Sequence, residues 1–178
     1  FVETDLRRPG LRAGAFDVVY ASGVLHHTPN PRASFARIAA LARPGGMIVV
    51  GLYNAFARIP LRLRRFVARL SGYRWIPFDP VLRERDDEPA RREAWLRDQY
   101  QHPEEHRHTL GEVQNWFDEN GIEYVRAYPS ALIGDTPDDL LTAAGDTWRP
   151  EAWLAQLGWM RSLGHEGGLF VTVGRRTT

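Results

Sequence analysis

Two short apolar runs separated by a helix-length segment constrain the fold of this chain more than any other feature. The runs FDVVYA (Phe16–Ala21) and MIVVGLY (Met47–Tyr53) are nearly continuous in apolar residues, as in parallel strands buried on both faces. Between them, Asn30-Pro31 has the pattern of a helix N-cap and first helical residue, and Pro44-Gly45-Gly46 ends the helix. Four apolar residues recur there at helical spacing: Phe35, Ile38, Ala39 and Ala42. Together they predict a right-handed βαβ crossover, and therefore an α/β fold with a mostly parallel sheet.

The size and composition fit one domain. The chain has 178 residues, a net charge of +1 and no cysteine, which excludes a disulfide scaffold, a thiolate zinc site and a cysteine nucleophile. The lack of cysteine suits a reducing compartment, so we expect a cytoplasmic location. No apolar run approaches the ~18 residues of a membrane span. Phe1-Val2 resembles the end of a strand, so we expect residues 1–178 to form a single, N-terminally truncated domain.

An arginine-rich helix is expected after the second apolar run. Pro60 can open it, and its apolar residues recur at helical spacing: Ile59, Leu63, Phe66, Val67 and Leu70. The helix Arg58–Arg69 has two interpretations, peripheral contact with an anionic membrane or phosphate, or an ordinary helix covering a sheet. We expect the second. A charged, proline-punctuated segment follows, so residues 55–108 are interpreted as a lid-like insertion, with a short helix around Ala90–Gln99.

The remainder predicts two further strands. Thr109-x-x-Glu112 is a capping box that opens a helix with Val113, Trp116 and Phe117 on one face, and Gly121 ends it. Strands are expected at 122–128 and 168–174. Residues 130–166 form a second predicted insertion, with a helix near Pro150–Leu157.

The segment from Phe16 to Tyr53 resembles class I S-adenosylmethionine-dependent methyltransferases of the small-molecule type. The matching features are Asp17 at the start of a strand, Leu25-His26-His27 after it, Pro31-x-x-x-Phe35, and Leu41-x-Arg43-Pro44-Gly45-Gly46. The resemblance implies a partial Rossmann-like fold with helices on both faces, in which strands 122–128 and 168–174 form an antiparallel closing pair. That pair and Leu41–Gly46 argue against an NAD-dependent Rossmann enzyme.

The resemblance also implies where the cofactor binds. Asp5 would accept a hydrogen bond from the adenine amine, and the Leu6 backbone N–H would donate to a ring nitrogen. Ala21, Ser22 and Gly23 would line the methionine end, because small residues let the backbone approach a ligand closely. The alternative for Asp5 is a solvated loop aspartate, and the alternative for Ala21–Gly23 is a tight turn at the end of a strand. The family's glycine-rich loop would precede Asp5, so this chain alone is expected to bind S-adenosylmethionine weakly.

The adjacent histidines are the catalytic candidates. A neutral imidazole of His27, or of His26, can take a proton from an attacking nucleophile. Cofactor or lid contact and simple packing are the alternatives for His27. In quinone O-methyltransferases the histidine matching His27 binds a metal beside acidic residues. Gly23 and His26 stand at the matching acidic positions here, so no metal is expected.

Lid and substrate contacts are expected from Tyr53, Asn54, Tyr100 and His102. The surrounding sequence, His102-Pro-Glu-Glu-His106-Arg-His108, has metal-like spacing, but Pro103 excludes a helical H-E-x-x-H motif. A substrate lid is preferred to a zinc site, with a solvated loop as the further alternative.

The sequence thus predicts methyl transfer from S-adenosylmethionine to a small-molecule substrate, by a longer protein that includes this chain. The alternative is a catalytically silent binding or interaction domain with the same fold. No recognised nucleic-acid-binding module and no aromatic-interleaved basic strand is present, so no nucleic acid is expected.

Overall fold

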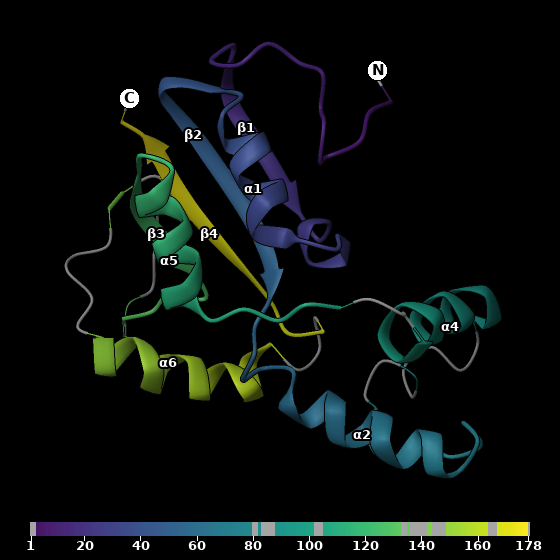
Figure 1. Ribbon diagram of the computed structural model, residues 1–178. Coiled ribbons are helices and arrows are strands. Elements are labelled where there is room, and N and C mark those ends of the chain that lie inside the picture. Colours follow the sequence, from purple (N-terminus) through teal and green to yellow (C-terminus); the bar gives the residue numbers. More distant parts are fainter. Residues whose placement is uncertain are drawn as a thin grey trace.

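A four-stranded sheet forms the centre of the fold in the computed structural model (Figure 1). The structure describes residues 3–79, 82, 88–101, 105–132, 135, 142–143, 149–163 and 167–177. The strands are β1 (Phe16–Ser22), β2 (Ala42–Tyr53), β3 (Ile122–Tyr128) and β4 (Leu169–Arg176), in the spatial order β1-β2-β4-β3. The pair β1–β2 is parallel, and β4 is antiparallel to both β2 and β3. The predicted α/β fold and its antiparallel closing pair are confirmed.

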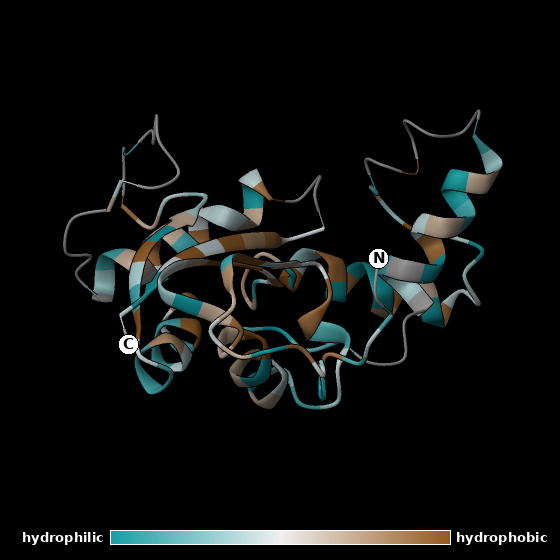
Figure 2. Ribbon diagram, turned by 90° about the horizontal axis from the view of Figure 1, so that it is seen from above, coloured by the Kyte–Doolittle hydropathy of each residue, from teal (hydrophilic) through white to brown (hydrophobic). Residues whose placement is uncertain are grey.

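Three helices share one core with the sheet. They are α1 (Pro31–Ala39), α5 (Leu110–Glu119) and α6 (Arg149–Ser162), and their apolar side chains pack with Ile48, Val50 and Phe170. In this core Phe35 of α1 stacks on Phe117 of α5, with ring centroids 5.5 Å apart. Figure 2 shows the hydrophobic colours concentrated along the strands, while the helices carry both hydrophobic and hydrophilic residues.

The predicted helix ends are confirmed by their hydrogen bonds. Asn30 Oδ1 accepts from the Ala33 N–H at 3.0 Å, which begins α1. Thr109 Oγ1 accepts from the Glu112 N–H at 3.2 Å, which begins α5. Gly121 has φ +64°, a conformation that glycine adopts at little cost, and β3 starts immediately after it.

Two expectations for the βαβ unit are wrong in detail. Helix α1 ends at Ala39, and Ala42 belongs to β2, whose pairing with β1 shifts between Phe16↔Ala42 and Val18↔Met47. The extra residues of β2 are accommodated in that shift, where Gly45 takes φ +75°. Strand β1 is also not buried on both faces, since Val18 and Tyr20 are exposed. The described helices that pack on the sheet lie against the other face of β1, so these two side chains remain uncovered.

The segment between β2 and α5 forms a small cluster of its own. It contains α2 (Ile59–Leu70), α4 (Pro89–Leu96) and a π-helical turn, η2 (Arg97–Gln101). Figure 1 places α2 and α4 beyond the carboxyl ends of β1 and β2. The expected sheet-covering role of α2 is wrong, because Leu63, Phe66 and Leu70 are exposed and only Leu61 and Ala68 are buried. Periodicity identifies an apolar stripe but does not say what the stripe packs against.

The described part of the chain contains no helix long and apolar enough to cross a membrane. The expected strand end at Phe1-Val2 lies outside the described residues, as does part of the predicted insertion 130–166.

Gly174 provides a test of the core packing. A Cβ atom at this position would lie 2.5 Å from Ile122 Cγ2 and from Phe117 Cε2, in a region with no free space. Gly174→Ala should lower the free energy of unfolding by about 1–3 kcal/mol through overpacking, measured by urea denaturation. Gly158→Ala is the control, because no atom lies within 4 Å of its Cβ position in α6. That control should raise stability by about 0.5–1 kcal/mol, and equal losses in both variants would contradict the packing argument.

Candidate functional site

Small residues occupy the carboxyl end of β1, as predicted. Ala21 is buried, and Ser22 pairs with Gly51 of β2 so closely that a Cβ at Gly51 would lie 2.1 Å from Ser22 Oγ. Gly23 has φ +77° and donates its N–H to Gly51 O at 3.1 Å. Apart from its neighbours in the chain, none of the described residues lies within 4 Å of its Cβ position. The turn therefore favours glycine, and it faces open space into which a ligand could approach.

His26 is completely buried directly after this turn. It lies in a 3-10 helix, η1 (Leu25–His27), with 0% exposure, and neither ring nitrogen has a hydrogen-bond partner among the described residues. Burial and the neighbouring charges of His27 and Arg58 lower its pKa to about 3. His26 is therefore a neutral imidazole at neutral pH.

His27 is less buried and lies against the same neighbours. Its ring centroid is 4.2 Å from that of His26 and 5.9 Å from that of Tyr53, edge-on in both cases. Of the two histidines predicted as proton acceptors, His27 has the greater access to solvent. The structure brings both of them together with Tyr53, which the sequence indicated only as a substrate contact.

Tyr53 ends β2 between an imidazole and a guanidinium group. The His26 ring centroid is 3.9 Å from the Tyr53 ring, and the Arg58 guanidinium carbon lies 3.8 Å from its centroid. The Tyr53 hydroxyl accepts a hydrogen bond from Gln99 Nε2 at 3.2 Å. Such cation–π contacts strengthen when the groups are desolvated, as they are here. The position of the Tyr53 side chain is thus fixed by His26 and Arg58 at its ring and by Gln99 at its hydroxyl.

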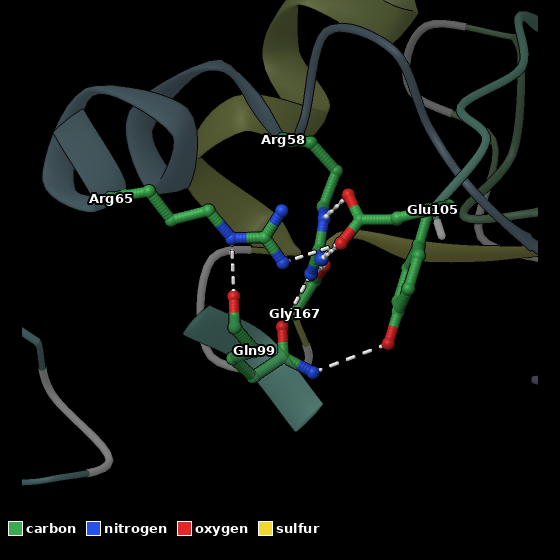
Figure 3. A network of polar contacts seen from close by, with 6 residues as sticks. Arg58, Arg65, Gln99, Glu105 and Gly167 are labelled. Atoms are coloured by element: carbon green, nitrogen blue, oxygen red, sulfur yellow. Dashed lines mark hydrogen bonds and ion pairs between the residues drawn. The ribbon is translucent and has the colours of Figure 1, made fainter. Parts of the chain in front are cut away.

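Arg58 is the centre of a buried polar network (Figure 3). It is 1% exposed and forms a two-pronged ion pair with Glu105, whose side chain is 5% exposed; the Nε–Oε1 distance is 3.1 Å. Its remaining donor bonds go to Gln99 Oε1 and to Gly167 O. Arg65 adds a second ion pair to Glu105 and donates to the Gln99 backbone carbonyl. The network joins α2, η2, the segment before α5 and the turn before β4.

The charge of Glu105 is maintained by these arginines. Burial alone would raise its pKa, but the hydrogen bonds and charges of Arg58 and Arg65 outweigh burial and lower the pKa below its ordinary value. The sequence analysis missed this network. Arg58 and Glu105 are 47 positions apart, and neither has a sequence signal that distinguishes it from the other charged residues.

Asn54, predicted as a substrate or lid contact, makes its hydrogen bonds within the protein interior. It is fully buried, and its Oδ1 accepts from the Phe56 and Ala57 N–H groups at 3.0 Å each. Its Nδ2 donates to Gln156 Oε1 of α6 at 3.1 Å. These contacts form the corner between β2 and α2.

Tyr100, also predicted at the lid, is buried in the cluster around α2. It is 1% exposed, packs with Leu61 and Ala68, and donates its hydroxyl to Asp79 Oδ2. Burial, reinforced by Asp79, raises its pKa above the ordinary value. His102 lies outside the described residues.

Asp5 and Leu6 lie in the loop before β1. The Asp5 carboxylate is exposed and accepts hydrogen bonds from the Arg7 backbone N–H at 2.8 Å and from its guanidinium. Hydrogen bonds from Arg7 lower the Asp5 pKa to about 2. Leu6 is half-buried and packs against the main core. Asp5 is thus an ionised acceptor on the surface of the molecule.

The histidines of the segment 102–108 that the structure describes contact different partners. The His106 N–H donates to His26 O at 2.9 Å, and His108 Nδ1 lies 2.9 Å from Glu112 Oε1. Within the described ranges no three histidine, aspartate or glutamate side chains converge as metal ligands.

Burial of His26 predicts a pH-dependent stability. Its pKa is about 3 in the folded protein, against an ordinary value of 6.5, so the unfolded chain binds more protons between those limits. Stability should fall as the pH drops below 6.5, with a slope approaching about 1.4 kcal/mol per pH unit. Glu105 and Glu112, whose pKa values are lowered, add to this loss only below about pH 4.5. Urea denaturation between pH 6.5 and 4.5 measures this loss in a range where Glu105 and Glu112 contribute little. His26→Leu should flatten the slope, and an unchanged slope would contradict the assignment.

Removing the negative charge of Glu105 from the buried ion pair is expected to lower the stability of the protein strongly. Glu105→Gln leaves Arg58 buried without a countercharge and should lower the free energy of unfolding by about 3–5 kcal/mol. The matched control is Glu93→Gln in α4, which removes a surface pair with Arg97 whose glutamate is 65% exposed. That control should cost no more than about 1 kcal/mol. Similar losses for the two variants would show that the network contributes little.

Comparisons with known proteins identify the fold independently. The family model described as "Methyltransferase domain" matches residues 2–127. An uncharacterized protein of Synechococcus sp. is 25% identical over 150 residues, covering 69% of this chain and 36% of its own length. An uncharacterized chloroplastic methyltransferase of Arabidopsis thaliana is 34% identical over 76 residues, covering 40% of this chain and 21% of its own length.

A solved structure shows the same fold at low sequence identity. It is a Haloferax volcanii putative methyltransferase in complex with the Trm112 methyltransferase activator, 14% identical, with a TM-score of 0.51. The alignment covers 98% of this chain and 60% of that one. The chain spans about a third or less of the curated relatives that it matches. Because the family model covers most of its sequence, this chain belongs to the methyltransferase domain family.

Proposed function

We propose that this chain forms part of an S-adenosylmethionine-dependent methyltransferase that acts on a small-molecule nucleophile. The observation that carries the proposal is the arrangement at the carboxyl ends of β1 and β2. There the open turn at Gly23 adjoins the cluster of His26, His27 and Tyr53. Open α/β sheets bind their ligands at this edge.

The residues present fit one side of a cofactor site. The left-handed φ of Gly23 and the open space at its Cβ position allow close approach of a ligand to Ala21–Gly23. Asp5 is ionised and exposed, so it can accept a hydrogen bond from an amine after exchanging one of its bonds with Arg7. Asp5 and Leu6 would hold the adenine, and Ala21, Ser22 and Gly23 the methionine end. S-adenosylmethionine, when bound, supplies a methyl group on a positively charged sulfur.

The chain's own residues would position the nucleophile and accept its proton. His27 is the better proton acceptor because it is accessible, whereas burial excludes solvent from both nitrogens of His26. His26 and Arg58 instead pack against the Tyr53 ring, which is only 6% exposed, so Tyr53 would position the neighbouring His27 from within the protein. Holding two reactants in line can supply most of the rate enhancement of a transfer reaction.

The Arg58–Glu105 network would set the geometry of the lid. Glu105 is followed directly by His106, whose N–H donates to His26 O. The ion pair therefore fixes the segment before α5 against η1. We infer that this segment closes over the substrate, while Tyr100 supports it from within the α2 cluster.

His27→Ala distinguishes chemistry from binding in the full-length protein that carries this chain. If His27 accepts the proton, kcat for transfer of an isotopically labelled methyl group should fall by ~10²–10⁴-fold with cofactor affinity unchanged. The wild-type kcat–pH profile should rise through an imidazole-like pKa, and the variant should lack that rise.

The other outcomes are equally specific. A weaker cofactor dissociation constant with an unchanged pH profile would assign His27 to cofactor contact. A lower melting temperature alone would assign it to packing. Absence of both cofactor binding and methyl transfer in the folded wild-type protein would overturn the proposed function. His106→Ala is the control, since its described contact to His26 uses the backbone N–H.

A further inference from the structure

Helix α2 has two opposite apolar faces, and only one of them packs on the protein. Leu61 and Ala68 face inward, where they pack with Tyr100. On the opposite side, side chains at helical spacing form a stripe that is 43–74% exposed: Ile59, Leu63, Phe66 and Leu70. Among the described residues no element covers this stripe, because all four of its side chains are exposed. A helix that served only to complete the fold would need the inner face alone.

The apolar surface continues in the chain directly after α2. Tyr73, Trp75 and Phe78 are exposed, Phe78 by 80%. Ser71 hydrogen-bonds both the N–H and the carbonyl of Trp75, at 3.2 and 3.0 Å, which holds Trp75 beside the end of α2. These seven exposed residues are called the α2 patch, and its last three members also line a pocket with Arg92 and Leu96 of α4: Ile59, Leu63, Phe66, Leu70, Tyr73, Trp75 and Phe78. Exposed apolar patches of this kind mark interaction surfaces.

The stretch of sequence that contains the α2 patch is basic. Between Ala55 and Phe78 the sequence has six arginines and no acidic residue, although the whole chain is nearly neutral. Arg58 and Arg65 are paired with Glu105, but Arg62, Arg69 and Arg74 are exposed. Arg62 and Arg69 are seven residues apart, so they flank the apolar stripe on one side of the helix. The surface therefore attracts a partner that is both apolar and anionic.

An anionic lipid bilayer meets both requirements. Helices that lie in a membrane interface combine Trp, Phe and Leu on one face with flanking Lys or Arg. The 12 residues of α2 extend about 18 Å, too short to span a bilayer but suited to lying along its surface. A second copy of the chain would bring two arginine-flanked faces together, which like charges disfavour.

We propose that the α2 patch binds the surface of an anionic membrane. Leu63, Phe66 and Leu70 enter the acyl-chain boundary, while Arg62 and Arg69 contact lipid phosphates. Trp75 lies at headgroup depth beside the end of the helix. This inference rests on α2 alone and is independent of the proposed methyl transfer.

The test measures partition of the purified protein onto vesicles by co-sedimentation. Binding is expected on vesicles of phosphatidylcholine mixed with phosphatidylglycerol. It should be much weaker on phosphatidylcholine alone and should decrease as salt is added. Leu63→Ser/Phe66→Ser should weaken the binding at least tenfold. The matched control is Trp153→Ser/Leu154→Ser on α6, whose side chains are exposed to a similar degree, and it should bind like the wild type.

A second pair of variants separates charge from apolar insertion. Arg62→Gln/Arg69→Gln should weaken binding to the anionic vesicles by about 25-fold, at roughly fivefold per arginine. Arg37→Gln/Arg175→Gln, at exposed sites on α1 and β4, is the control and should have little effect. Circular dichroism checks that each variant is folded.

Three results would overturn the proposal. The first is a folded wild-type protein that does not bind anionic vesicles. The second is equal weakening by the patch and control variants, which would indicate binding through net charge or another surface. The third is a wild-type protein that forms a dimer, ignores vesicles and becomes monomeric in Leu63→Ser/Phe66→Ser, which would assign the patch to self-association.

Discussion

The buried pair of Arg58 and Glu105 is the interaction on which the region beyond the strand ends depends. Both side chains are almost completely removed from water, and such a pair is stable only when its remaining donors are satisfied. Gln99 and the Gly167 carbonyl provide those partners. Gly168 allows the close approach, because a Cβ there would lie 3.0 Å from Arg58 Cδ and the residue has φ +81°. The network thereby ties three other stretches of chain to one guanidinium.

The same guanidinium links the scaffold to the candidate site. Arg58 lies over one face of Tyr53, and His26 lies against the ring as well. Burial is the main reason that the pKa of His26 is lowered, and the nearby charges of His27 and Arg58 lower it further. Arg58 therefore helps to hold the Tyr53 ring in place and adds to the effect of burial that keeps His26 neutral.

Features governed by local rules could be predicted from the sequence. The caps at Asn30 and Thr109, the helix end at Gly121 and the strand Ile122–Tyr128 follow from residue type and spacing, and the structure has them all. Features that depend on distant contacts could not be predicted. Apolar periodicity alone does not show that the stripe on α2 faces outward, or that Val18 and Tyr20 on β1 remain uncovered.

The candidate site also has some features that could be predicted from the sequence and others that could not. The Ala21–Gly23 turn and the histidine pair were evident in the sequence, because their residue types at the end of a predicted strand indicate close ligand approach and proton transfer. The different burial of His26 and His27 was not evident in the sequence, because neighbouring residues in a short turn can lie in different environments. Asn54 and Tyr100 were predicted to contact the substrate, but their polar groups make contacts within the protein. The sequence alone does not distinguish a polar residue that contacts the substrate from one that supports the site from within the protein.

The bonding of Asn54 has a mechanical consequence. Gln156 Oε1 accepts from Asn54 Nδ2 and also from the Leu110 N–H, while Asn54 Oδ1 holds the chain that enters α2. The side chains of Asn54 and Gln156 thus connect α2, α5 and α6 through hydrogen bonds at one place. The two insertions, far apart in sequence, are joined at one buried point next to Arg58, so removing either amide side chain would disturb both insertions.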